Sequence, residues 1–257
     1  MRMQKYAKFI TWCVIGFCYA PILVLVVNSF NVCRSGALWE GFTLKWYREL
    51  FQASSIWKAT KNSILIACTS TFIAVPIGTT SGLACHFCKK RRVLKGITLL
   101  LNKMILIIPD LQLAVGLLLF FSFIHMRLGL TTLIIAHSTF SIVYVIQSVL
   151  ARMECLDFSM IEAAQDLGAK PKIILAKILF PLIRPTVLAS AILTFTVSID
   201  EFVLTSFLSG PTSPTLPLEI YGMIRNGFPP LVDTLAVLML GFSFVASWAF
   251  QQISNES

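Results

Sequence analysis

The chain has 257 residues, and 56% of them are hydrophobic while only 13% are charged, which excludes an ordinary soluble domain. Its mean hydropathy of +0.80 indicates an integral membrane protein. A net charge of +9 could point to nucleic acid, but no basic stripe with interleaved aromatic residues stands apart from the apolar segments, so we expect no nucleic-acid partner.

The first apolar run covers residues 9–27 and is long enough to cross the hydrocarbon core of a membrane. It follows Arg2, Lys5 and Lys8, whose positive charges favour a cytoplasmic N-terminus. A secretory signal would have a shorter apolar core and a small-residue cleavage site, and neither is evident. We therefore expect an uncleaved first span.

The next segment, residues 28–62, is polar and rich in tryptophan, which is typical of an external loop with a short helix on the membrane surface. A second apolar run covers residues 63–84 and ends before the basic cluster at residues 89–92, which places that end in the cytoplasm. Between them, Cys85 and Cys88 have the spacing of a redox motif but no second ligand pair, so we expect them to pack rather than to bind metal.

A third predicted span, residues 97–125, contains Pro109 and Asp110 near its middle, where the proline interrupts the backbone hydrogen bonds. A fourth covers residues 130–150 and includes His137 among hydroxyl-bearing neighbours. Polar side chains commonly bridge helices within membranes. We therefore expect His137 to hydrogen-bond to another helix rather than to bind a ligand.

Residues 152–177 form a polar segment between apolar runs, and their spacing predicts two short helices joined by a tight turn. Ser159 stands three residues before Glu162, as in a capping box, so a helix should begin directly after it. Gly168 suits the left-handed residue after a helix, and Pro171 suits the first position of the next one. An apolar face could dock on another protein or could lie on the membrane surface, and the spacing alone leaves both open. That face comprises Ile161, Ala164, Leu167, Ile174, Leu175 and Ile178.

A fifth predicted span covers residues 182–208 and is interrupted at residues 200–201, and the turn-rich segment 210–214 follows it outside the membrane. A sixth covers residues 231–250 and leads to a cytoplasmic C-terminus. This arrangement places about thirteen of the 21 Lys and Arg residues on the inner side, in agreement with the positive-inside bias. We predict one all-α membrane domain over residues 1–257, with six transmembrane helices.

Three acidic residues, Asp110, Asp200 and Glu201, lie near the middle of predicted spans. A carboxylate at the centre of a membrane helix costs about 2.5–3.5 kcal/mol on insertion scales, so such residues usually face a cavity, a partner or a pathway. Acids without intramembrane Lys or Arg favour a cationic solute. The alternative is structural, with the acids buried in neutral form or paired to a partner subunit.

The polar segment resembles the signature loop by which binding-protein-dependent ABC importer permeases contact their ATPase. Its pattern is Glu-Ala-Ala, three residues, Gly, nine residues, then Ile-x-Leu-Pro, and this chain departs from it only at Phe180, where the family usually has Leu. The resemblance implies that the loop transmits ATP-driven motion to the spans. The matching residues are Glu162, Ala163, Ala164, Gly168, Ile178 and Pro181.

Other strings, including residues 41–47, 108–110, 198–201, 209–211 and 215–221, look like the second permease subunit of spermidine/putrescine importers. That resemblance implies a type I importer fold in a bacterial inner membrane, surrounded by membrane lipid. It also implies a sister permease, two ATP-binding cassette subunits that bind ATP and Mg, and a periplasmic polyamine-binding protein. No cofactor or metal is expected on this chain. The implied substrate pathway comprises Tyr19, Trp46, Asp110, Ser198, Asp200 and Glu201, with an interface anchor as the alternative role of Trp46.

Three alternatives stay open beside a polyamine importer. The first is an ABC importer permease for another small solute, because other importers share the loop. The second is a secondary transporter or channel driven by an ion gradient. The third is a membrane enzyme, for which the sequence offers neither a paired nucleophile and base nor a complete set of metal ligands. The chain also lacks the glycine-rich phosphate loop that cradles ATP, so we expect a transporter subunit that is not itself an enzyme.

Overall fold

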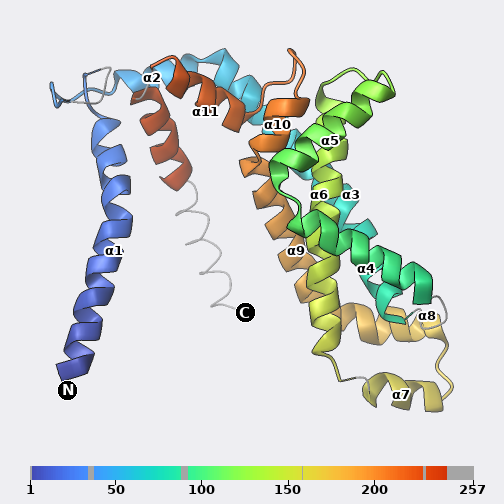
Figure 1. The fold of residues 1–257 in the computed structure, drawn as a ribbon. Helices are drawn as coiled ribbons and strands as arrows, with labels where there is room; N and C mark the ends of the chain where they lie inside the picture. The colour runs from blue at the N-terminus through green and yellow to red at the C-terminus, as the bar shows by residue number, and fades with distance from the viewer. Residues whose placement is uncertain (1, 34–37, 88–91, 158, 228–229, 242–257) are drawn as a thin grey trace. The chain divides into compact units, whose positions relative to one another are not determined.

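The computed structural model describes residues 2–33, 38–87, 92–157, 159–227 and 230–241, which form helices joined by turns (Figure 1). One isolated antiparallel bridge joins Asn31 to Phe42, and no longer strand pairing occurs in these ranges. The chain divides into two compact units, residues 1–57 with 219–257 and residues 58–218, and each is described by itself.

The first unit begins with the long helix α1 (Arg2–Asn28), whose apolar stretch Lys8–Asn28 is long enough to cross a membrane. The first predicted span therefore lies within one continuous helix. None of the 18-residue apolar window in this stretch is buried inside the protein, so the helix keeps its apolar side chains for lipid or for other subunits.

A polar loop follows α1 and leads to the short amphipathic helix α2 (Lys45–Gln52). Asn31 organises this loop: its side-chain amide donates to the Leu38 carbonyl at 2.7 Å, and its side-chain oxygen accepts from two backbone amides. The unit also contains most of α11 (Leu216–Arg225) and the short apolar helix Pro230–Gly241. The rest of the predicted sixth span, residues 242–250, lies outside the described residues.

The second unit is built around α6 (Leu130–Glu154), which packs along α9 (Phe180–Asp200). The long helix α3 (Ser54–Phe87) approaches α6 through Gly78 and Gly82, which are separated by three residues. A Cβ atom on Gly78 would lie 2.5 Å from Cβ of Val145, so this helix pair depends on glycine for its close approach.

The predicted third span is two helices, α4 (Arg92–Ile107) and α5 (Asp110–Phe123), whose axes differ by 113°. Pro109 precedes α5 with φ −58° and ψ 142°, and it has no amide hydrogen to continue the ladder of α4. The interruption that the sequence predicts near Pro109 is thus a sharp bend. It turns the chain back toward α6 and α10.

The fifth span starts before and ends before the predicted range of residues 182–208. It begins with α8 (Pro171–Ile174), continues through the π-helical turn η1 (Leu175–Leu179) into α9, and stops at Asp200. A separate short helix, α10 (Val203–Leu208), follows and packs on α5 and α6. A core of buried side chains joins these three helices, with Ala114, Phe121, Leu133, Ala136, Phe140, Leu204 and Leu208 as members together with Ile66 of α3.

Candidate functional site

The break between α9 and α10 places two carboxylates at the end of a membrane helix. Asp200 is the last residue of α9 and is exposed, whereas Glu201 follows in an extended conformation with ψ 105° and is partly buried. The Glu201 Oε1 atom accepts a hydrogen bond of 3.0 Å from the amide of Leu204. Glu201 therefore satisfies one of the free amides in the first turn of α10.

Polar side chains beside this break form a buried network. Ser198 on α9 lies 2.7 Å from Nδ1 of His137 on α6, and Nε2 of the same ring lies 3.4 Å from the Thr205 hydroxyl on α10. Ser198 also lies 3.3 Å from the Ser70 hydroxyl on α3. The histidine is 2% exposed and links both sides of the break, which confirms the predicted helix-bridging role of His137.

The bend before α5 places Asp110 within electrostatic range of Glu201. Asp110 is the first residue of α5 and is exposed, and α5 packs on α10, whose first turn Glu201 caps. Both carboxylates also act on the hydroxyl of Tyr144 on α6. The structure thus brings together two of the three predicted intramembrane acids from separate helix breaks.

Tyr144 is a member of this cluster that the sequence reasoning missed. It lies seven residues after His137, so both residues fall on the same side of α6 after two turns. That spacing is the signal that could have identified it. The Tyr144 ring also contacts Phe140 edge to face, with centroids 5.1 Å apart.

Tyr19 and Trp46 belong to the first unit. Tyr19 on α1 is exposed, whereas Trp46 on α2 is 6% exposed and donates its indole N–H to the Asn31 carbonyl at 2.7 Å. The Trp46 ring therefore stabilises the loop after α1. A pathway role for either residue stays a prediction.

The polar segment between α6 and α9 contains the two expected short helices. Helix α7 (Ser159–Asp166) begins at Ser159, and the carboxylate of Asp157 accepts from the Ser159 amide at 2.9 Å. The backbone and side-chain hydrogen bonds from Ser159 lower the pKa of Asp157. Asp157 thus holds the start of α7, where the sequence predicts that Ser159 itself precedes the helix.

The turn after α7 has the geometry that the sequence predicts. Gly168 has φ +77°, its amide donates to the Gln165 carbonyl at 2.9 Å, and the Ala169 amide donates to the Ala164 carbonyl at 3.0 Å. These two bonds form a Schellman motif. Pro171 then occupies the first turn of α8, so the predicted helix, turn and helix are confirmed.

The prediction that this apolar face docks on another protein is wrong for most of its residues, because other parts of this chain cover them. Ile161 and Ile174 are buried in a cluster with residues of α6, η1 and α9, and Ala164 and Ile178 pack against it. Helical spacing indicates a face that is buried, but it does not identify which protein buries it. The exposed surface of this segment includes Glu162, Ala163, Gly168, Leu167 (89% exposed) and Leu175.

Cys85 is buried at the end of α3, and Cys88 lies outside the described residues. A packing role for Cys85 agrees with the behaviour of a small apolar side chain.

Comparison with known proteins identifies the family. The family described as "Binding-protein-dependent transport system inner membrane component" matches residues 74–255. The chain is 37% identical over 241 residues to the spermidine/putrescine transport system permease protein PotC of Escherichia coli strain K12, which covers 94% of this chain and 90% of that protein. It is 34% identical over 231 residues to the putrescine transport system permease protein PotI of the same strain, with coverages of 88% and 82%.

A solved structure shares the fold. The crystal structure of a bacterial ABC transporter involved in the import of the acidic polysaccharide alginate contains a chain with a TM-score of 0.67 at 15% identity, covering 98% of this chain and 96% of that chain. This likeness confirms the predicted all-α permease fold. With the family match over residues 74–255 and the identity to PotC, it shows that the chain belongs to the binding-protein-dependent transport system inner membrane components, the permeases of ABC importers.

Proposed function

We propose that this permease moves polyamines such as spermidine and putrescine across the bacterial inner membrane. The observation that carries the proposal is a pair of carboxylates at the starts of two helices that pack together, Asp110 at the start of α5 and Glu201 just before α10. A polyamine is an extended polycation, and its ammonium groups bind to carboxylates and to the faces of aromatic rings, with about 0.5–2 kcal/mol for each ring contact. The relatives named for polyamine transport support the same solute.

Within the described residues, no Lys or Arg forms an ion pair with the acids of this cluster. The only ion pair within the described residues joins Lys45 to Glu49, far along the chain from either helix break. Unpaired carboxylates near the ends of membrane helices attract a cationic solute. Asp200 and Ser198 lie at the same break, so we assign them to the pathway. The family resemblance alone assigns Tyr19 and Trp46 to it.

The partners in this proposal are a sister permease, two ATP-binding cassette subunits and a periplasmic polyamine-binding protein. ATP and Mg bind to the cassette subunits, and this chain carries no cofactor of its own. The exposed surface around Glu162, Ala163 and Gly168, with Ala164 behind it, receives the motion of a cassette subunit. In this arrangement both termini and the segment between α6 and α9 lie in the cytoplasm.

The test is uptake of labelled spermidine and putrescine into proteoliposomes that contain the full complex and its binding protein. Replacing Asp110 with Asn or Glu201 with Gln should lower ATP-dependent uptake about tenfold, which corresponds to the loss of one interaction of about 1.4 kcal/mol. Glu49→Gln is the matched control, because it removes an exposed carboxylate outside the cluster and should leave uptake unchanged.

Two outcomes would contradict the proposal in different ways. If the assembled native complex hydrolyses ATP but moves neither polyamine, the importer assignment survives and the solute is another small molecule. If polyamine uptake continues without ATP, transport is driven by an ion gradient and the coupling to cassette subunits is wrong.

A further inference from the structure

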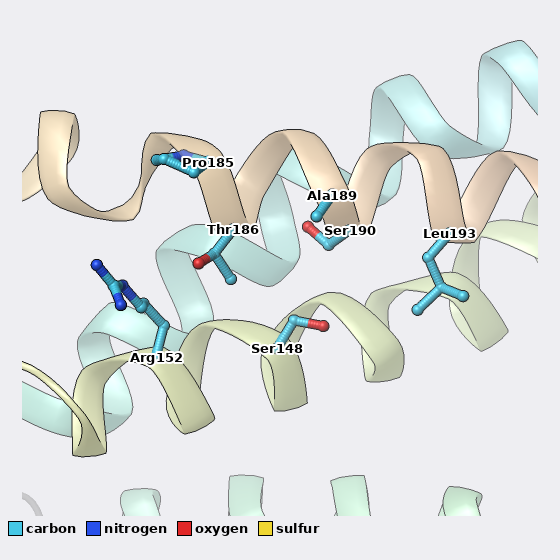
Figure 2. A pocket seen from close by; sticks show the side chains of 7 residues that line it. All are labelled: Ser148, Arg152, Pro185, Thr186, Ala189, Ser190 and Leu193. Carbon is cyan, nitrogen blue, oxygen red and sulfur yellow. The ribbon is translucent and has the colours of Figure 1, made fainter. Parts of the chain in front are cut away.

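A pocket of about 430 Å³ lies between α6 and α9, near the end of α6 that leads to α7 (Figure 2). It lies apart from the acidic cluster, because its lining contains no carboxylate and none of the pathway residues. The residues that line it are Ser148, Arg152, Pro185, Thr186, Ala189, Ser190 and Leu193.

The end of the pocket nearest α7 offers hydrogen-bond donors. The Nε and Nη2 atoms of Arg152 donate long hydrogen bonds of 3.4 Å to the Leu182 carbonyl, and the other N–H groups of the guanidinium have no partner among the described residues and can bind an anion. No carboxylate lies within ion-pair distance of Arg152 in the part of the chain that the structure describes. The Thr186 hydroxyl makes no hydrogen bond to any described residue.

The other polar residues of the lining have their protons committed to their own helices. The Ser148 hydroxyl donates to the Tyr144 carbonyl at 2.9 Å, and the Ser190 hydroxyl donates to the Val187 carbonyl at 2.9 Å. Arg152 and Thr186 are therefore the two donors that a ligand can use. One guanidinium and one hydroxyl together suit one phosphate group, whose oxygens accept hydrogen bonds from both.

The opposite end of the pocket is apolar. Pro185 and Leu193 are eight residues apart on α9, which corresponds to about 12 Å along the helix axis. Ala189 and Leu193 line the pocket toward that end, and Leu193 stays 43% exposed within this chain. Figure 2 shows Arg152 and Leu193 at opposite ends of the row of lining side chains. A ligand that fills the pocket thus needs an anionic end and an apolar end.

We propose that the pocket binds an anionic phospholipid, with its phosphate on Arg152 and Thr186 and the start of an acyl chain along Ala189 and Leu193. Basic pockets between membrane helices attract anionic headgroups by the same charge complementarity. The positive charge of Arg152 disfavours a polyamine, so the proposed ligand of this pocket differs from the transported solute. In the proposed orientation this pocket faces the cytoplasmic leaflet of the membrane. The binding of the lipid itself does not depend on that orientation.

The test is titration of the purified, assembled complex with phosphatidylglycerol and with phosphatidylcholine, followed by native mass spectrometry. Arg152→Gln and Thr186→Val should each weaken retention of phosphatidylglycerol, the first about tenfold, as expected for loss of a hydrogen bond to a charged group. Arg152→Lys should keep part of the affinity because it keeps the charge. Arg184→Gln is the matched control, since this exposed arginine on α9 does not line the pocket and its loss should change nothing.

Three outcomes would overturn the proposal. Equal retention of the two lipids would remove the role of charge, and native retention in both Arg152→Gln and Thr186→Val would remove the pocket as the site. Displacement of phosphatidylglycerol by millimolar inorganic phosphate would make free phosphate the ligand in place of a lipid. Thr186→Val conserves side-chain shape, so it keeps the test decisive if Arg152→Gln fails to assemble. None of these readouts depends on which solute the complex transports.

Discussion

At the scale of single residues, Glu201 makes two hydrogen bonds that hold the break between α9 and α10, and its carboxylate is partly buried. Its side chain accepts from the Leu204 amide at 3.0 Å, and its backbone carbonyl accepts from the Thr205 hydroxyl at 2.8 Å. The same carboxylate lies in the field of Asp110. The side chain that caps α10 is therefore also one that a cation would meet, and the two roles can be separated by mutation.

Replacing Glu201 with Gln retains an oxygen that can accept from Leu204 but removes the charge, whereas replacement with Leu removes both. We expect Glu201→Leu to lower the free energy of unfolding by about 1 kcal/mol through loss of the cap, and Glu201→Gln to remain close to the native value. Both should lose polyamine uptake. Thermal unfolding of the purified complex, measured beside uptake, checks the two effects.

Asp200→Asn is the control for stability, because Asp200 is exposed and caps no helix among the described residues. Its unfolding temperature should match that of the native complex. Equal destabilisation by Glu201→Gln and Glu201→Leu would show that the charge, and not the acceptor oxygen, holds α10 in place.

The residues of the acidic cluster could be predicted only in part. The depth of an acid in the membrane can be predicted from its position within a span of known length. This reasoning identified Asp110 and Glu201. The rotation of one helix against another is not encoded in a single span, so Ser70 could not be predicted, whereas the spacing of Tyr144 from His137 on α6 was a signal within one span. The burial of Trp46 depends on the path of the loop around Asn31, which no local pattern indicates.

At the scale of elements, the functional residues lie where helices break or turn. The bend before Asp110 follows from Pro109, and the turn after α7 follows from Gly168 and Pro171, so the sequence could predict both. The end of α9 at Asp200 has no proline or glycine to mark it. There the polar network of His137, Ser198 and Thr205 and the cap from Glu201 stabilise the break, and these are tertiary contacts.

Gly168 tests whether the turn between α7 and α8 transmits motion. Its φ of +77° costs most side chains about 1–2 kcal/mol, whereas Asn tolerates this conformation better. No atom lies within 4 Å of a Cβ built on Gly168, so the cost comes from the backbone and not from a clash. We expect Gly168→Val to lower both uptake and the stimulation of ATP hydrolysis by the binding protein, and Gly168→Asn to keep most of both.

Gly116→Ala serves as the control for this pair, because a Cβ there also meets no atom within 4 Å but the residue lies inside α5. It should leave coupling intact. Native activity in Gly168→Val would contradict a role for the turn. If Gly168→Asn and Gly168→Val lower uptake and ATP hydrolysis equally, the reason for glycine is the close approach of a partner and not the backbone conformation.

At the scale of the whole molecule, the lengths of the apolar segments predict the membrane crossings more directly than the sequence predicts any tertiary contact. Among the described residues, four helices are long and apolar enough to cross a membrane, the bent pair α4 and α5 together meets the same test, and Pro230–Gly241 is a shorter apolar helix. The first five predicted spans correspond to five of these segments in chain order, and Pro230–Gly241 covers the start of the sixth, whose remainder lies outside the described residues. The charges of the connections, and not the helices themselves, predict which side each connection occupies.

This predicted orientation can be measured with two single cysteines on either side of α9. Cys155 is exposed directly after α6, and Thr212 is exposed in the turn between α10 and α11. Pro171–Asp200 is the one candidate span between them, so they must lie on opposite sides of the membrane if that segment crosses it. In an otherwise cysteine-free chain, we expect an impermeant maleimide applied to spheroplasts to label Thr212→Cys, and to label Cys155 only after permeabilisation. The reverse pattern would invert the topology, and labelling of both in intact cells would mean that α9 does not cross.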